Sequence, residues 1–216
     1  MRLRRGDFRA AIGGALLAAA LSGCAYNVAY NPGYVAAARR PAAQVADGRV
    51  LVLTERADDA YVYTGNPTSF TGSATTLTIP LGEITRRIAV TVYGDAFKGG
   101  AEASNELGDP ARYTLVIHPK LVNYSYEYNQ IKNIGFAITP TVRVSIKVAL
   151  LGADGRPSWE KIYESGDVEG ESYMISGSPE EKIDKTTHKA IYDLLVRSTA
   201  DVLPRVAKTA MRGTSR

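Results

Sequence analysis

Cys24 is the residue of this 216-residue chain whose side chain is best suited to covalent chemistry. It is the only cysteine, so no intramolecular disulfide can form, even in an oxidising compartment. As a thiolate, a cysteine is nucleophilic enough to accept a diacylglyceryl group. It follows Leu21, Ser22 and Gly23, and small residues before a cut let the backbone enter a narrow peptidase site. This spacing predicts cleavage between Gly23 and Cys24, with modification of the new N-terminal thiol.

The residues before Cys24 have the charge and apolar pattern of an export signal. The stretch Met1–Arg9 carries four arginines against one acid, Asp7, and Ala10–Ala20 is uncharged. A transmembrane helix needs roughly 20 apolar residues, so this shorter run fits the central region of a signal peptide. With Leu21-Ser22-Gly23-Cys24 at its end, the chain resembles the bacterial lipoproteins, whose lipobox reads Leu-(Ala/Ser)-(Gly/Ala)-Cys. The resemblance implies a lipoprotein signal peptide over 1–23 and a Cys24 that carries diacylglycerol and palmitate. An ordinary signal peptide followed by a chance cysteine is the alternative.

The residue after the acylated cysteine bears on the destination of the protein. In enterobacterial lipoproteins an aspartate at this place favours retention in the inner membrane, and this chain has Ala25. The resemblance therefore implies a lipid-anchored, periplasm-facing protein of the outer membrane.

The charge of the chain becomes nearly balanced once the signal is removed. The whole sequence has 26 basic and 22 acidic residues, and residues 1–23 hold four of the arginines and one of the acids. A mature chain so close to neutrality argues against a nucleic-acid partner, which requires a basic surface. We expect the partners to be the membrane, through Cys24, and an envelope protein or glycan.

Catalytic motifs do not emerge from the sequence. The two histidines, His118 and His188, fall in different predicted elements, and no Gly-x-Ser-x-Gly, Walker or His-Glu-x-x-His motif occurs. The stretch Ser158–Lys161 matches the Ser-x-x-Lys of penicillin-recognising enzymes, but it lies on a predicted strand and lacks the companion motifs. We therefore expect no catalytic residue, no metal site, no cofactor and no enzymatic activity.

A row of tyrosines is the strongest candidate for a binding surface. Tyr124, Tyr126 and Tyr128 occur at every second residue, which in a strand makes an aromatic ladder suited to a sugar ring or a partner's apolar side chain. If the row lies on the open face of the sheet, it is joined there by Arg143 and Lys147. The alternative is that the tyrosines pack beneath a helix.

Composition and patterning divide the chain into four parts. We expect a signal peptide over 1–23, a lipidated N-terminus with a flexible tether over 24–48, a single α+β periplasmic domain over 49–205, and a basic C-terminal tail over 206–216. The tether is predicted from its Asn, Pro, Gly and Ala content, and the tail from its arginines and lysine.

Strand patterns dominate the domain. In Thr141–Leu151 apolar residues at even positions alternate with polar ones as far as Lys147, as in a half-buried antiparallel strand, and Ala153–Arg156 supplies the turn to a partner strand at Ser158–Ser165. In Tyr113–Tyr128 the apolar residues change parity midway, which predicts a β-bulge, and Pro119 is its natural place.

Two stretches have helical signals. Residues Gly82–Phe97 carry apolar side chains at three- and four-residue spacing. The second helix begins with Ser178 as its N-cap and Pro179 at its first position, Glu181 completes a capping box, and the helix ends at Pro204. Its buried stripe consists of Ile183, Thr187, Ala190, Ile191, Leu194 and Val202. The fold class that follows is α+β, a mostly antiparallel sheet with two helices on one face. The alternative is a β-sandwich with one C-terminal helix, in which Gly82–Phe97 is a strand.

The order and patterning of the elements over residues 49–204 also resemble the small YajG-type envelope lipoproteins. More distantly, the chain is similar to lipoprotein activators of penicillin-binding proteins and to auxiliary lipoproteins of ABC-type transporters. The resemblance implies a non-enzymatic accessory or binding role in the cell envelope. A carrier or sensor of a small lipid or glycan, an auxiliary transport subunit, and a hydrolase with an unrecognised site stay open as alternatives.

Overall fold

A long hairpin of two 15-residue strands forms the centre of the fold, β6 (Leu115–Asn129) and β7 (Ala137–Leu151). They pair in antiparallel fashion from Val116↔Leu151 at one end to Asn129↔Thr139 at the other. The structure is a computed structural model that describes residues 25–42, 45–129, 137–174 and 179–213, with side chains as far as residue 206. The alternation that predicted a strand over Thr141–Leu151 is confirmed by β7.

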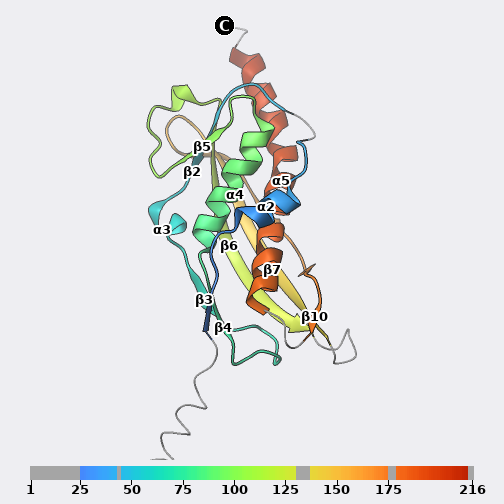
Figure 1. The fold of residues 1–216 in the computed structure, drawn as a ribbon. Coiled ribbons are helices and arrows are strands. Elements are labelled where there is room, and N and C mark those ends of the chain that lie inside the picture. The colour runs from blue at the N-terminus through green and yellow to red at the C-terminus, as the bar shows by residue number, and fades with distance from the viewer. Residues whose placement is uncertain (1–24, 43–44, 130–136, 175–178, 214–216) are drawn as a thin grey trace, which may run out of the picture.

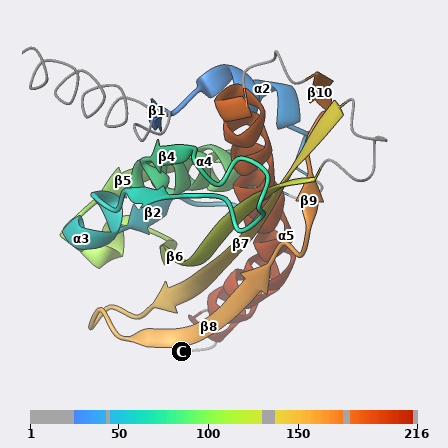
Figure 2. The same ribbon diagram turned by 90° about the horizontal axis from the view of Figure 1, so that it is seen from below.

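The remaining strands extend this hairpin into a mixed sheet. On one side β6 pairs with β2 (Val50–Leu53), which pairs with β5 (Ala101–Ser104), and both of these ladders are parallel. On the other side β7 forms antiparallel ladders with three strands, β8 (Pro157–Glu164), β9 (Val168–Glu169) and β10 (Tyr173–Met174). Figure 2 shows β8 at the edge of the sheet beyond β7. The sheet is therefore antiparallel around β7 and parallel around β2.

Two helices cover one face of this sheet, α4 (Leu81–Ala96) and α5 (Pro179–Gly213) (Figure 1). Helix α4 contacts β2 and β6, whereas α5 contacts β7 and packs along α4. The predicted α+β class is confirmed, and the alternative β-sandwich is wrong because 81–96 is helical. All six residues of the predicted α5 stripe are buried, at 2% exposure or less. Within the described chain, no helix combines the length and apolarity needed to cross a membrane.

Helix α5 does not end at Pro204, as the sequence predicted, but continues to Gly213. A proline inside a helix removes one hydrogen bond and crowds the carbonyl four residues earlier. The residues after it can still donate to their own partners, so the proline interrupts the pattern without ending the helix. The predicted basic tail 206–216 is therefore helical over most of its length. The predicted cap Ser178 lies outside the described residues.

The segment predicted as a flexible tether lies against the domain. Strand β1 (Ala25–Asn27) pairs with β4 (Thr76–Ile79), which also pairs with β3 (Tyr63–Gly65), and the three form a second small sheet. Helix α2 (Pro32–Ala38) then packs on α5 and buries Val35. The tether prediction is wrong over this stretch because its aromatic and apolar side chains find a surface to cover.

A β-bulge lies at Val122, between Leu121↔Ile146 and Asn123↔Ser145. It confirms the predicted change of parity but sits three residues after Pro119, which pairs regularly with Val148. One extra residue turns the following side chains to the other face of the strand. Odd-numbered residues such as Ile117 therefore face the helices before the bulge, and even-numbered residues face them after it.

Candidate functional site

The tyrosine row that the sequence offered as a binding face belongs to the core. The exposed fractions are 7% for Tyr124, 1% for Tyr126 and 4% for Tyr128. These residues of β6 pair with Val144, Val142 and Pro140 of β7. The bulge at Val122 directs them toward α5 and the small sheet. The prediction of an exposed aromatic face is wrong, and the alternative of packing beneath a helix is confirmed.

Each tyrosine hydroxyl lies in a different environment. The Tyr124 hydroxyl is 2.9 Å from the Thr187 Oγ1 on α5, and the Tyr126 hydroxyl donates to the Gly65 carbonyl at 3.0 Å. The Tyr128 hydroxyl has no hydrogen-bond partner among the described residues. Burial is the main cause that raises the pKa of all three hydroxyls well above the ordinary tyrosine value. The row therefore joins β6, α5 and β3 into one core and has no surface for a ligand.

The two basic residues proposed beside the tyrosines lie on the opposite face of the sheet. Arg143 forms ion pairs with Asp167 and with Glu127, and the Lys147 Nζ is 3.4 Å from the Glu160 Oε2. Both basic side chains are partly exposed, at 43% and 34%. Because their charges are matched by neighbouring carboxylates, this face is a set of ion pairs rather than a basic patch.

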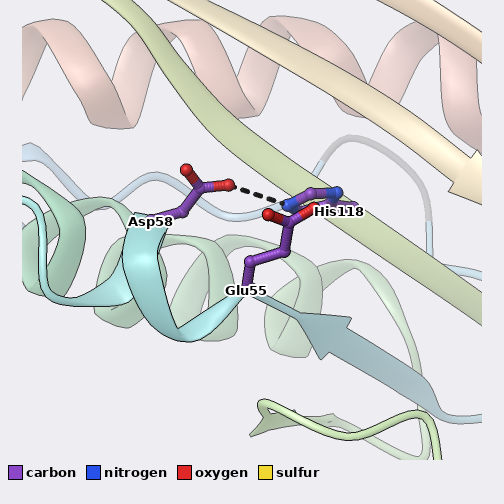
Figure 3. Close-up of side chains that lie close together, drawn as sticks. All are labelled: Glu55, Asp58 and His118. Carbon is purple, nitrogen blue, oxygen red and sulfur yellow. Dashed lines mark ion pairs between the residues drawn. The ribbon is translucent and has the colours of Figure 1, made fainter.

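The structure brings together a cluster that no sequence pattern indicated (Figure 3). One ligand atom from each of Glu55, Asp58 and His118 lies within 4.8 Å of the others. Asp58 is on the short helix α3 (Arg56–Asp59), Glu55 precedes it, and His118 is on β6. The His118 Nε2 and the Asp58 Oδ2 are buried, 3.4 Å apart, and neither has a hydrogen-bond partner among the described residues.

Imidazole and carboxylate are ligand types of divalent metals such as zinc, but a competing cation is already present. The Lys120 Nζ lies 2.9 Å from the Asp58 Oδ1, and this contact raises the pKa of Lys120. A dication bound by Asp58 would therefore lie beside an ammonium group. We assign the cluster as an ion-pair connection between α3 and β6. His118 follows Asp58 by 60 positions in the sequence, so no local spacing signalled the cluster.

His188 lies in a separate cluster on α5. Its Nε2 accepts a hydrogen bond from the Asn31 backbone N–H at 3.1 Å, so the proton of the neutral ring is on Nδ1, which faces the Asp184 carbonyl at 3.0 Å. The rings of Tyr30 and Tyr34 each lie 5.6 Å from the imidazole. The histidine is fully buried and holds the N-terminal segment on the domain. The structure therefore keeps the two histidines apart, each with its own partners.

A cleft of about 760 Å³ lies at one end of the main sheet. Its walls come from the start of β6, the end of β7, the 3₁₀ turn η1 (Pro110–Arg112) and the C-terminal half of α5. Leu115, Leu150 and Trp159 give it apolar and aromatic walls, and the Arg205 guanidinium lies over the Trp159 ring at 4.5 Å. Among the described residues that line it there is no histidine, cysteine or carboxylate. The arrangement can bind apolar groups, and its polar lining includes hydroxyls, among them that of Tyr113, and the Arg205 guanidinium.

Cys24 and Gly23 lie outside the described residues, but Ala25, which follows them directly, has a defined place. It pairs with Thr76 at the beginning of β4, and the Val28 N–H donates to the Thr78 carbonyl at 2.9 Å. The chain thus enters the domain at the end where β6 finishes and the loop between β3 and β4 lies. This is the end opposite to the cleft.

Comparison with known proteins gives little sequence similarity. No family model matches this chain, and no curated protein matches it. Among solved structures, it is similar to a candidate lipoprotein from Caulobacter crescentus, with 13% identity, coverage of 59% of this chain and 83% of that chain, and a TM-score of 0.35. It is also similar to a homologue of neuraminyllactose-binding hemagglutinin from Helicobacter pylori, with 8% identity, coverage of 80% and 92%, and a TM-score of 0.43. Both scores are low, so the proposals below rest on the residues of this chain.

Proposed function

We propose that this chain is a lipid-anchored lipoprotein of the outer membrane, facing the periplasm, and that its domain is a non-enzymatic binding module. The lipobox Leu21-Ser22-Gly23-Cys24 and the basic and apolar stretches before it support the anchor. Ala25 after the cysteine supports the outer membrane as its destination. The described residues that line the cleft support binding without catalysis, because they include no histidine, cysteine or carboxylate.

The observation that carries the proposal is the position of the cleft relative to the anchor. Residues 113–116, which lead into β6 and begin it, line the cleft, whereas Tyr126 and Tyr128 near its end contact the loop that precedes β4. A strand rises about 3.3 Å per residue, so Val116 and Tyr128 are about 40 Å apart. A lipid on Cys24 would hold one end of the domain at the bilayer and leave the cleft at the other end. Such an arrangement presents an apolar binding site to the periplasm.

Site-specific crosslinking in cells tests this proposal. A photoreactive amino acid replaces Ala153, an exposed residue of the cleft, and in a control it replaces Lys189, an exposed residue of α5. We expect a defined crosslinked partner from position 153 and none from 189. The same adduct should be lost when Trp159→Ala removes the aromatic wall. Equal products from both positions, or an adduct insensitive to Trp159→Ala, would refute the assignment of the cleft as the binding site.

The volume of the cleft favours a second candidate function, a carrier of a small apolar ligand. About 760 Å³ falls within the range of small-molecule sites, roughly 300–1,000 Å³. Trp159 is the only tryptophan of the chain, so its fluorescence reports occupancy of this site alone. Native mass spectrometry of the purified protein should then show a bound small molecule that Trp159→Ala releases. A protein that carries no such molecule, and whose fluorescence is unchanged by envelope lipid extracts, would rule out the carrier.

A further inference from the structure

The end of the molecule where the chain enters β1 also carries the most exposed large apolar side chain among the residues that the structure describes. Phe70 lies in the loop 66–75, between β3 and β4, and is 96% exposed. Met174 on β10 is 60% exposed, and β10 pairs with the beginning of β7 at the same end of the sheet. In Figure 1 the labels β3, β4 and β10 mark this end, and the C-terminal part of α5 marks the opposite one. A single exposed apolar residue is common on protein surfaces. The residues around Phe70, however, indicate a role for its exposure.

The loop that holds Phe70 is tied to the domain on both sides. The Thr68 N–H donates to the Tyr126 carbonyl at 2.9 Å, and the Ser69 Oγ accepts from the Tyr128 N–H at 2.9 Å. Gly72 has a φ of +75° and lies against the Tyr128 ring, where an added Cβ would come within 2.6 Å of a ring carbon. A side chain at this place is excluded by both the backbone conformation and the close approach. The exposure of Phe70 is therefore built into an ordered loop.

The segment around Phe70 has no charged residue. From Ala60 to Gly82 the sequence contains no lysine, arginine, aspartate or glutamate, although 22% of the whole chain is charged. Charged side chains resist transfer into a membrane, whereas aromatic ones are favoured at its interface. A charge-free segment with an outward phenylalanine has the composition that contact with lipid requires.

The position of Ala25 brings the lipid to the same place. Ala25 pairs with Thr76, the first residue of β4, and loop 66–75 directly precedes it. Because β1 and β4 are parallel, Ala25 is the residue of β1 that lies nearest to this loop. The proposed anchoring residue directly precedes Ala25 in the sequence, and neighbouring Cα atoms are about 3.8 Å apart.

We propose that loop 66–75 rests on the bilayer that holds the Cys24 lipid and inserts Phe70 into its interface. This inference rests on the proposed anchoring at Cys24. Its partner is a phospholipid leaflet, and the contact is apolar, since residues 60–82 offer no basic side chain to an anionic headgroup. The contact of loop 66–75 adds a second attachment to the bilayer and fixes the orientation of the domain. With the lipid alone the domain could rotate about its anchor. The loop contact directs the cleft away from the membrane.

A depth measurement on the full lipidated chain tests the contact. Ala74→Cys, in the loop, and Ala153→Cys, at the cleft, each provide an exposed thiol for an environment-sensitive dye. An acylated Cys24 has no thiol left to react, so one dye attaches per chain. In phosphatidylcholine vesicles we expect the dye at 74 to shift to shorter wavelength and to be quenched by lipids spin-labelled near the headgroup. The dye at 153 should show neither effect.

Three further comparisons complete the test. Phe70→Ser in the Ala74→Cys chain should reduce the quenching several-fold, whereas Phe70→Leu should keep most of it. Adding anionic lipid or salt should change the quenching little. If the protein floats with vesicles but positions 74 and 153 are equally exposed to water, the contact proposed for the loop is wrong and the anchor stands. If the protein does not float with the vesicles and a second dye attaches at Cys24, the proposed anchoring is wrong, and the proposed loop contact is then wrong as well.

Discussion

Substitution of Tyr124 is the sharpest test of the finding that the tyrosine row is core. Tyr124→Phe removes only the hydroxyl, which is 2.9 Å from the Thr187 Oγ1. Thr187 keeps a partner, because its hydroxyl also lies 2.8 Å from the Ile183 carbonyl. No buried group is left without a hydrogen bond, so the loss should stay in the range of one ordinary hydrogen bond, about 0.5–1.5 kcal/mol.

Tyr124→Ala removes the whole ring from a site that is 7% exposed. The ring also contacts Tyr63 and Tyr126, with centroids 4.8 and 6.4 Å away. Deleting a buried aromatic side chain costs about 3–5 kcal/mol, a large part of the 5–15 kcal/mol that stabilises a typical domain. For a domain of this size the midpoint of thermal unfolding should fall by about 10 °C, against a few degrees for Tyr124→Phe.

Urea unfolding followed by circular dichroism measures both changes. Tyr61→Ala is a matched control, because Tyr61 is 43% exposed and should change the free energy of unfolding by less than about 0.5 kcal/mol. If Tyr124→Ala unfolds at the same urea concentration as Tyr61→Ala and wild type, the ring is not packed as described. The row would then become available again as a binding face.

Four other substitutions or conditions have defined outcomes. Leu194→Ala, at a position 2% exposed, should lower the free energy of unfolding by about 2–5 kcal/mol, and an unchanged urea midpoint would mean that α5 is not docked. Deleting Val122 should abolish the cooperative unfolding transition, because it removes the bulge and turns one apolar set of β6 to the wrong face, whereas the exposed Val122→Ala should unfold like wild type. The free energy of unfolding should fall as pH rises above about 10, the ordinary tyrosine pKa. Burial raises the pKa of the tyrosines in the folded protein, that of Tyr173 to about 12, so that between these values only the unfolded chain ionises. A urea midpoint constant from pH 9 to 11.5 would contradict this. Cys24→Ser should abolish incorporation of a palmitate analogue, and equal labelling of variant and wild type would end the lipoprotein assignment.

Local pattern in the sequence was enough for the three longest strands of the main sheet, β6, β7 and β8. The alternation in 141–151 has one solution, a strand with one buried face, and β7 confirms it. The α5 stripe and the 82–97 periodicity likewise identified both helices and their buried sides. The parity change in β6 revealed a bulge, but its position was misplaced at Pro119 because a proline can occupy an extended strand without disturbing it.

The candidate sites depended on contacts that no local pattern encodes. Whether the tyrosines face core or solvent is decided by which element covers them, and here α5 and the small sheet do so from more than 50 residues away along the chain. The same holds for Glu55, Asp58 and His118, which meet only because α3 lies beside β6.

The sequence by itself determined the α+β class and the buried faces of the helices, and it predicts the covalent chemistry at Cys24. These depend on neighbouring residues and on periods of two and 3.6. Only the tertiary structure decided that residues 25–42 lie on the domain, that the tyrosines are core, and that the cleft and the entry of the chain are at opposite ends of β6. Those features arise when two surfaces distant in sequence bury one another. The free energy of that burial depends on both surfaces together, so neither segment's sequence predicts it alone.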